Sequence, residues 1–121
     1  MAATRIVVLV AMGAVLWFLA ALLIRAMQPL GALHAPGVVV TYALVAAGTA
    51  PIVWLTRRLV GAEQTMFAIT LVTGTATLLD GNALVWIPAL YGPDTAGAGA
   101  AILWGAGVAL ILGIVMGRRA A

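Results

Sequence analysis

One acidic residue, Asp80, lies inside an apolar stretch that runs from residue 65 to residue 88. A carboxylate at membrane depth costs about 2.5–3.5 kcal/mol on insertion scales, so it requires a partner, a proton or a function. Thr73 and Thr77 precede it at helical spacing, which places the three side chains on one face of a helix. Such a face could form a path for protons or for a polar substrate, with Asp80 as the titrating group.

The threonines on this face also have a purely structural interpretation. Thr70 extends the face by one more turn, Gly74 and Gly81 lie close by, and Asn82 lies on a different face. In bilayers, threonine hydroxyls often donate to carbonyls of their own helix or bridge neighbouring helices. The sequence leaves both interpretations open.

Arg25 is the candidate counter-ion for Asp80. It ends the first apolar run, on the side of the membrane to which Asp80 is nearer. An ion pair between the two could fix the packing of their helices, or it could open when a ligand or proton arrives. The candidate buried polar site therefore consists of Asp80, Arg25, Thr73 and Thr77.

The last apolar run carries a small residue at every fourth position. These residues are Gly97, Ala101, Gly105, Ala109, Gly113 and Gly117. This spacing lets two helix backbones approach closely, so it predicts a helix-packing face. The partner could be another helix of the same chain, a second copy, or a subunit of a larger membrane complex.

Composition places the chain in a membrane. Of its 121 residues, 65% are hydrophobic and only 7% are charged, whereas a soluble domain carries about 25% charged residues. The mean hydropathy is +1.22. With no cysteine, one histidine and three acids, we expect no metal site. Motifs for nucleophilic catalysis or phosphate binding are absent from the sequence, so we expect no enzyme and no cofactor.

The hydrophobic pattern predicts an all-α membrane protein with an antiparallel bundle of four transmembrane helices. The apolar runs predict helices at about 6–26, 36–56, 65–88 and 96–117 within one domain, 1–121. Each run is long enough to cross a hydrocarbon core of about 30 Å. Short turns containing proline and glycine separate the runs.

The arginines predict the orientation. With four spans, Arg25 alone lies on one side, and the other five arginines lie on the side of both termini. These five are Arg5, Arg57, Arg58, Arg118 and Arg119. Because positive residues accumulate in the cytoplasm, both termini should be cytoplasmic. Arginines scattered in this way indicate topology signals, so we expect no binding of nucleic acid.

Two segments resemble a known family. Residues 78–88 read LLDGNALVWIP and residues 102–107 read ILWGAG. Together with Arg25 at the end of the first helix, they resemble a bacterial family of small four-helix membrane proteins catalogued as a domain of unknown function. That family usually has two aromatic residues before the proline, where this chain has Trp86 and Ile87. The resemblance implies four helices in a bacterial inner membrane and implies no activity.

These observations favour a structural or accessory membrane protein that is not an enzyme. Its expected partners are the lipid bilayer and either further copies of itself or a larger membrane complex. The alternative is a small transporter or channel subunit that uses Asp80, with Arg25 as counter-ion.

Overall fold

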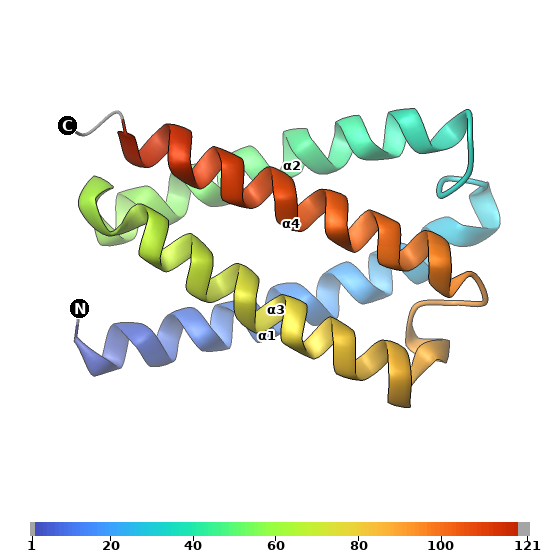
Figure 1. Ribbon diagram of the computed structural model, residues 1–121, viewed down its shortest axis with the longest axis horizontal. Helices are drawn as coiled ribbons and strands as arrows, with labels where there is room; N and C mark the ends of the chain where they lie inside the picture. Colours follow the sequence, from blue (N-terminus) through green and yellow to red (C-terminus); the bar gives the residue numbers. More distant parts are fainter. Residues whose placement is uncertain (1, 119–121) are drawn as a thin grey trace.

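The computed structural model describes residues 2–118, and its regular structure is helical throughout. The long helices are α1 (Ala3–Met27), α2 (Gly37–Val60), α3 (Thr65–Trp86) and α4 (Thr95–Arg118). Short 3₁₀ turns follow the first three of them: η1 (Gln28–Leu30), η2 (Ala62–Gln64) and η3 (Pro88–Leu90). No strand occurs within residues 2–118, so the predicted all-α fold with four long helices is confirmed (Figure 1). Arg119, one of the arginines that predict the orientation, lies outside the described residues.

The helices begin and end where local chemistry requires it. α2 ends at Val60, before Gly61, whose φ of 83° suits glycine and whose N–H bonds the carbonyl of Arg57 at 2.8 Å. α3 ends because Pro88 has no N–H and pushes Ile87 out of the helical region, to φ −137° and ψ 56°. α4 begins after Asp94, whose carboxylate Oδ1 accepts the N–H of Gly97 at 2.8 Å.

All four helices are long and apolar enough to cross a membrane. The shortest, α3, has 22 residues and is about 33 Å long at 1.5 Å per residue. Large apolar side chains on every helix face outward, with Val7, Leu44, Leu78 and Leu103 each more than 60% exposed. An apolar surface of this extent suits lipid rather than water, and it indicates a multi-pass membrane protein.

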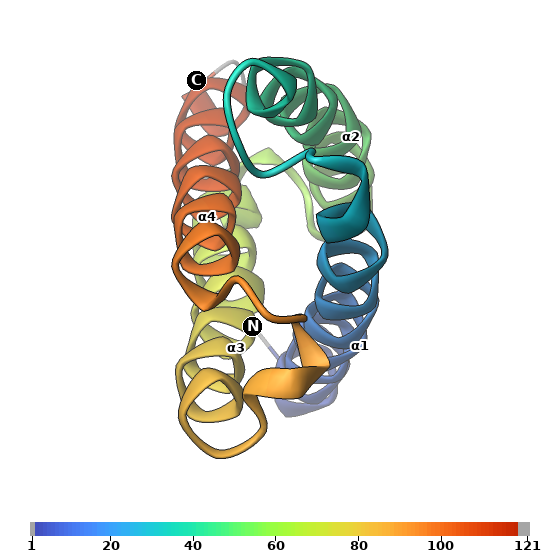
Figure 2. The same ribbon diagram turned by 90° about the vertical axis from the view of Figure 1, so that its right-hand side faces the viewer.

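The helices do not all pack equally. α3 contacts α1 and α4 extensively, and α4 also contacts α2, whereas α1 and α2 share hardly any contacts. Figure 2, viewed along the helices, shows α3 and α4 on one side of the molecule and α1 and α2 on the other. The packing order is therefore α1–α3–α4–α2, and α3 and α4 form its centre.

Small side chains allow the closest approach between α1 and α3. A Cβ placed on Gly13 would lie 2.7 Å from the carbonyl oxygen of Val72 and 2.9 Å from Cβ of Thr75. The nearby buried residues Leu9, Ala68 and Val72 form one of the two hydrophobic clusters. The packing of α1 on α3 therefore depends on the missing side chain at Gly13.

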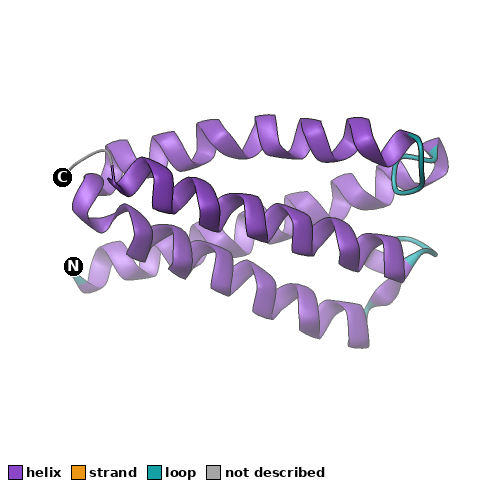
Figure 3. Ribbon diagram, turned by 45° about the horizontal axis from the view of Figure 1, so that its top comes forward, coloured by secondary structure: helices purple, strands orange, loops and turns teal. Residues whose placement is uncertain are grey.

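The two ends of the molecule differ in what they contain. The start of α1, the end of α4 and the connection between α2 and α3 lie at one end (Figures 1 and 3). The α1–α2 connection (28–36) and the α3–α4 connection (87–94) lie together at the opposite end. We call this second end the two-loop end, and most of the long-range polar contacts of the molecule lie there.

Candidate functional site

Asp80 lies on the buried side of α3, and its partner is a tyrosine. Asp80 is only 8% exposed. The hydroxyl of Tyr91 donates to Oδ1 of Asp80 at 2.5 Å. The same hydroxyl oxygen accepts a hydrogen bond from the indole Nε1–H of Trp17 at 2.9 Å. This chain of two hydrogen bonds connects α1, α3 and the α3–α4 connection.

Tyr91 reaches Asp80 because the chain turns back after α3. Pro88 starts the η3 turn, and the backbone N–H of Tyr91 bonds the carbonyl of Pro88 at 3.1 Å. The tyrosine is then fully buried. It packs against three alanines, one each from α1, α3 and α4: Ala21, Ala83 and Ala98. These small residues leave the space that the phenol ring fills.

Burial also keeps the tyrosine protonated. Removal from water, followed by the hydrogen bond to Asp80, raises the pKa of Tyr91 well above its ordinary value. The indole of Trp17, which donates to the phenol oxygen, acts in the opposite direction and more weakly. The phenol therefore stays a donor over the whole physiological range, and Asp80 keeps its partner.

The expected ion pair between Arg25 and Asp80 does not form within residues 2–118. Arg25 is exposed and lines a cavity at the two-loop end. The reason is the register of α1 against α3. Tyr91 connects Asp80 to Trp17, and Arg25 lies eight residues further along α1, about 12 Å along the helix axis. Tyr91 thus takes the position that the sequence suggested for the arginine.

The threonines do not join Asp80 in one polar site. Thr77 is exposed and donates to the carbonyl of Thr73 at 2.6 Å, while Thr73 itself is half-buried. Thr70 is also exposed. Three residues turn a helix by about 300°, so the side chains of Thr77 and Asp80 point about 60° apart around α3. The boundary between the buried and the exposed side of α3 runs between them. The structure supports the backbone-bonding interpretation for Thr77.

The small residues of α4 pack within the chain. All six of Gly97, Ala101, Gly105, Ala109, Gly113 and Gly117 are buried or half-buried. A Cβ on Gly113 would lie 3.1 Å from Cγ2 of Ile69 in α3, and one on Gly105 would lie 3.5 Å from Cγ1 of Val45 in α2. Of the interpretations left open, the intramolecular one matches this geometry, and this face of α4 is occupied by α2 and α3.

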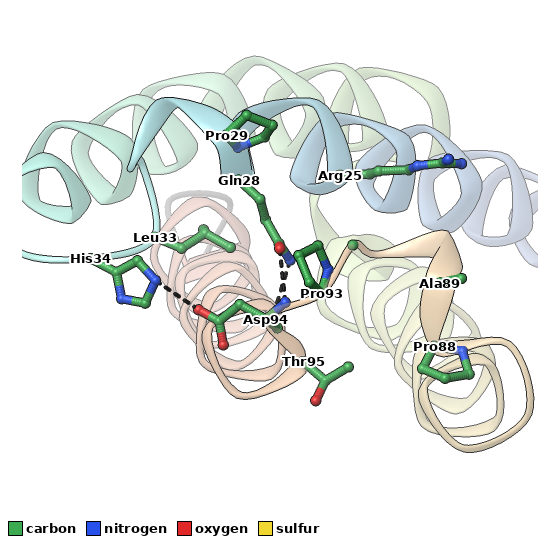
Figure 4. A pocket seen from close by; sticks show the side chains of 11 residues that line it. Arg25, Gln28, Pro29, Leu33, His34, Pro88, Ala89, Pro93, Asp94 and Thr95 are labelled. Carbon is green, nitrogen blue, oxygen red and sulfur yellow. Dashed lines mark hydrogen bonds and ion pairs between the residues drawn. The ribbon is translucent and has the colours of Figure 1, made fainter.

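A glutamine joins the two connections at the two-loop end. The Nε2 group of Gln28 donates to the carbonyls of Tyr91 and Asp94 at 2.6 and 3.0 Å. Its Oε1 accepts the backbone N–H of Asp94 at 2.8 Å. Figure 4 shows the glutamine side chain pointing from the end of α1 toward the α3–α4 connection. Three hydrogen bonds from one side chain hold the connection that carries Tyr91.

Next to Gln28 lies a cavity of about 900 Å³. Its walls come from the end of α1, both connections and the start of α4, and include Arg25, Pro29, His34 and Pro88 (Figure 4). The imidazole Nε2 of His34 lies 3.0 Å from Oδ2 of Asp94 on this wall. The cavity therefore combines apolar walls with a few polar side chains at one end of the molecule.

Sequence reasoning missed Tyr91, Trp17 and Gln28 as functional residues. The available signal was that a buried carboxylate needs a donor, and only a few donors lie in the apolar runs or beside them. Choosing among them requires the rotation and register of α1 and α3.

The described residues contain no group of three or more histidine, aspartate or glutamate side chains that could hold a metal ion. No protein-family model, curated protein or solved structure matches the chain. The arguments for a function therefore come from the chain's own residues and their contacts.

Proposed function

We propose that this protein is a non-enzymatic structural or accessory protein of a bacterial cytoplasmic membrane. It forms an antiparallel bundle of four transmembrane helices with both termini in the cytoplasm. Five arginines on the side of the termini against one on the other support this orientation. The bacterial address and the unknown-function family come from the resemblance carried by residues 78–88 and 102–107.

The outward face of α3 is the observation that carries the proposal. Four small or hydroxyl-bearing residues follow one another on it at spacings of four, three and four: Thr70, Gly74, Thr77 and Gly81. All four are exposed, and a Cβ on either glycine would have nothing within 4 Å. We call these four residues the α3 outer strip. Small residues of this kind let a further transmembrane helix approach closely.

Outside the α3 outer strip, α3 exposes a further polar side chain, Asn82, and a polar amide is poorly accommodated by lipid tails. Asn82 is exposed about 100° around the helix from Gly81, and its Nδ2 group donates to the carbonyl of Leu78 at 2.9 Å. Its position, about one turn before the end of α3, lies within the hydrocarbon region. The hydroxyl groups of Thr70 and Thr77 offer both donors and acceptors without net charge, so the strip is complementary to itself. The proposed occupant is the α3 helix of a second copy.

The buried polar groups support a structural role for the rest of the bundle. Asp80 is engaged by Tyr91, and Tyr91 by Trp17, so these groups join elements of the fold. The small residues of α4 are already used by α2 and α3. The sequence left the partner of the α4 face open, and the contacts of that face within the chain support α3 as the helix that contacts another protein.

Cysteine crosslinking tests the proposal directly, because the chain has no cysteine of its own. Gly81→Cys should form a disulfide-linked dimer in native membranes under mild oxidation. Gly107→Cys is the matched control, since Gly107 is an exposed glycine on α4 with equally open surroundings. Equal crosslinking at both positions would refute a specific α3 contact.

Native mass measurement in detergent provides the second arm. The Gly74→Leu and Gly81→Leu variants should be monomeric where the wild type and Gly107→Leu are dimeric. The wild type could instead be monomeric alone and purify with another membrane protein in a fixed ratio. That result would mean that a partner subunit, and not a second copy, occupies the α3 outer strip.

A transport subunit is the second candidate. Asp80 lies within a transmembrane helix, and its partner Tyr91 directly precedes Gly92, which lines the cavity. The residue whose side chain donates to the acid is thus a chain neighbour of the cavity wall. Proton uptake by proteoliposomes that depends on Asp80 would favour this function, and equal uptake by wild type and Asp80→Asn would oppose it.

A further inference from the structure

The α1–α2 connection packs onto the first turn of α4 at the two-loop end. Leu33 in this connection is only 8% exposed, and its Cβ lies 3.2 Å from the position that a Cβ on Gly97 would take. His34 follows, with its side chain 69% exposed and its Nε2 3.0 Å from Oδ2 of Asp94. Figure 4 shows the imidazole and the carboxylate facing each other from the two segments.

The two oxygens of Asp94 have separate roles. Oδ1 accepts the N–H of Gly97 and caps α4. Oδ2 is buried and has no hydrogen bond within the described residues, and the imidazole of His34 is its ion-pair partner. A buried carboxylate oxygen gains most from a charged donor, because few water molecules reach it.

We propose that His34 and Asp94 form a proton-sensitive latch that holds the α1–α2 connection on α4. A neutral imidazole offers one donor nitrogen and no charge, whereas the protonated ring offers two donors and attracts the carboxylate. The latch is therefore closed when the imidazole is protonated and the carboxylate is ionised. It loosens as the pH rises and the imidazole loses its proton.

The remaining charged and titratable groups near the latch do not produce this dependence. Arg25 lines the same cavity from the end of α1, and a guanidinium group does not act as a proton switch in proteins. Tyr91, on the α3–α4 connection, is buried and has a raised pKa, so it stays neutral. Since Leu33, His34 and Asp94 all line the cavity, loosening of the latch widens access to the cavity.

Hydrogen exchange of the α1–α2 connection tests the latch in detergent-solubilised protein. The ratio of exchange rates between His34→Gln and the wild type, taken at one pH, cancels the intrinsic pH dependence of exchange. At about pH 5.5 the wild type should exchange about two- to fivefold more slowly than His34→Gln, as a partly exposed ion pair permits. At about pH 8 the two should be equal, because glutamine retains a neutral donor.

Asp94→Asn is the second variant. Asparagine keeps the capping oxygen for Gly97 but loses the charge, so α4 stays folded and the pH-dependent protection of the amides of residues 31–35 disappears. A rate ratio that is the same at both pH values, whether large or equal to one, would overturn the proposal. If either variant fails to fold, exchange of the amides of residues 31–35 in the wild type, relative to amides in the middle of α1, gives the same comparison. The latch is independent of the α3 outer strip.

Discussion

The hydroxyl of Tyr91 lies 2.5 Å from the carboxylate Oδ1 of Asp80 and donates to it. The end of α3 and the η3 turn separate the two residues along the chain. The bond therefore holds the segment after η3 against α3. Because the same hydroxyl accepts from Trp17 at 2.9 Å, this contact also attaches α1. A single phenol thus satisfies a buried carboxylate of α3 and the indole N–H of a half-buried tryptophan of α1.

Tyr91→Phe should destabilise the protein by about 1–3 kcal/mol, because it leaves the Asp80 carboxylate and the Trp17 N–H without their shared partner. Unfolding with sodium dodecyl sulfate in mixed micelles measures this free energy. Tyr42→Phe is the control, since the ring of Tyr42 stacks on Trp104 at a centroid distance of 4.9 Å and the substitution keeps that ring. An equally small effect of both variants would contradict the role of the hydroxyl.

The raised pKa of Tyr91 also predicts a loss of stability at high pH. In the unfolded chain a tyrosine ionises near pH 10, whereas the buried phenol holds its proton to a higher pH. The unfolded state therefore loses a proton first, and the stability that Tyr91 contributes is complete below about pH 10 and declines above it. The free energy of unfolding should fall less steeply above this pH in Tyr91→Phe than in the wild type. Equal slopes would exclude the effect.

The Asp80 variants should follow a defined order. Asp80→Asn keeps an oxygen that accepts from Tyr91, so its folded yield in membranes should lie close to that of the wild type. Asp80→Ala removes the acceptor and leaves the buried hydroxyl unsatisfied, so its yield should be lower. Quantitative fluorescence of a C-terminal fusion reports the yield. Indistinguishable yields for the wild type and both variants would argue against any packing role of Asp80.

Arg25 and Asp80 should be energetically independent. Because no ion pair connects them within residues 2–118, the double-mutant cycle of Arg25→Gln and Asp80→Asn should give a coupling below about 0.5 kcal/mol. Unfolding in mixed micelles supplies the four free energies. A coupling energy above about 1 kcal/mol would show that Arg25 and Asp80 interact as the sequence suggested.

Glycine substitutions should distinguish two kinds of helix contact. Gly13→Ala places a methyl group 2.7 Å from the backbone oxygen of Val72, which cannot move aside without shifting α3. It should destabilise the protein by about 1–3 kcal/mol. Gly105→Ala meets only Val45 at an ordinary 3.5 Å and should be neutral or stabilise α4 by up to about 1 kcal/mol. If Gly105→Ala lowered the free energy of unfolding more than Gly13→Ala, α1 and α3 would not approach closely at Gly13.

Composition and local pattern were sufficient to predict the helices. Four runs of apolar residues, interrupted by Pro88 or by glycines such as Gly61, determine where a helix can continue and where it must end. These are properties of neighbouring residues, so the sequence alone expresses them. The small-residue spacing on α4 likewise predicted a packing face, but not which helices would cover it.

The contacts of Asp80 depended on tertiary structure. Whether Arg25, Tyr91 or Trp17 reaches the carboxylate is decided by the rotation of α3 and its register against α1, and a shift of one turn moves a side chain by about 5.4 Å. Close packing at Gly13 and burial of Tyr91 among alanines set that register. The sequence alone established a membrane-type helical chain with one acid that needs a partner. Only the packed structure decided that a phenol supplies it, because hydrogen bonds between distant segments depend on the full three-dimensional arrangement of the helices.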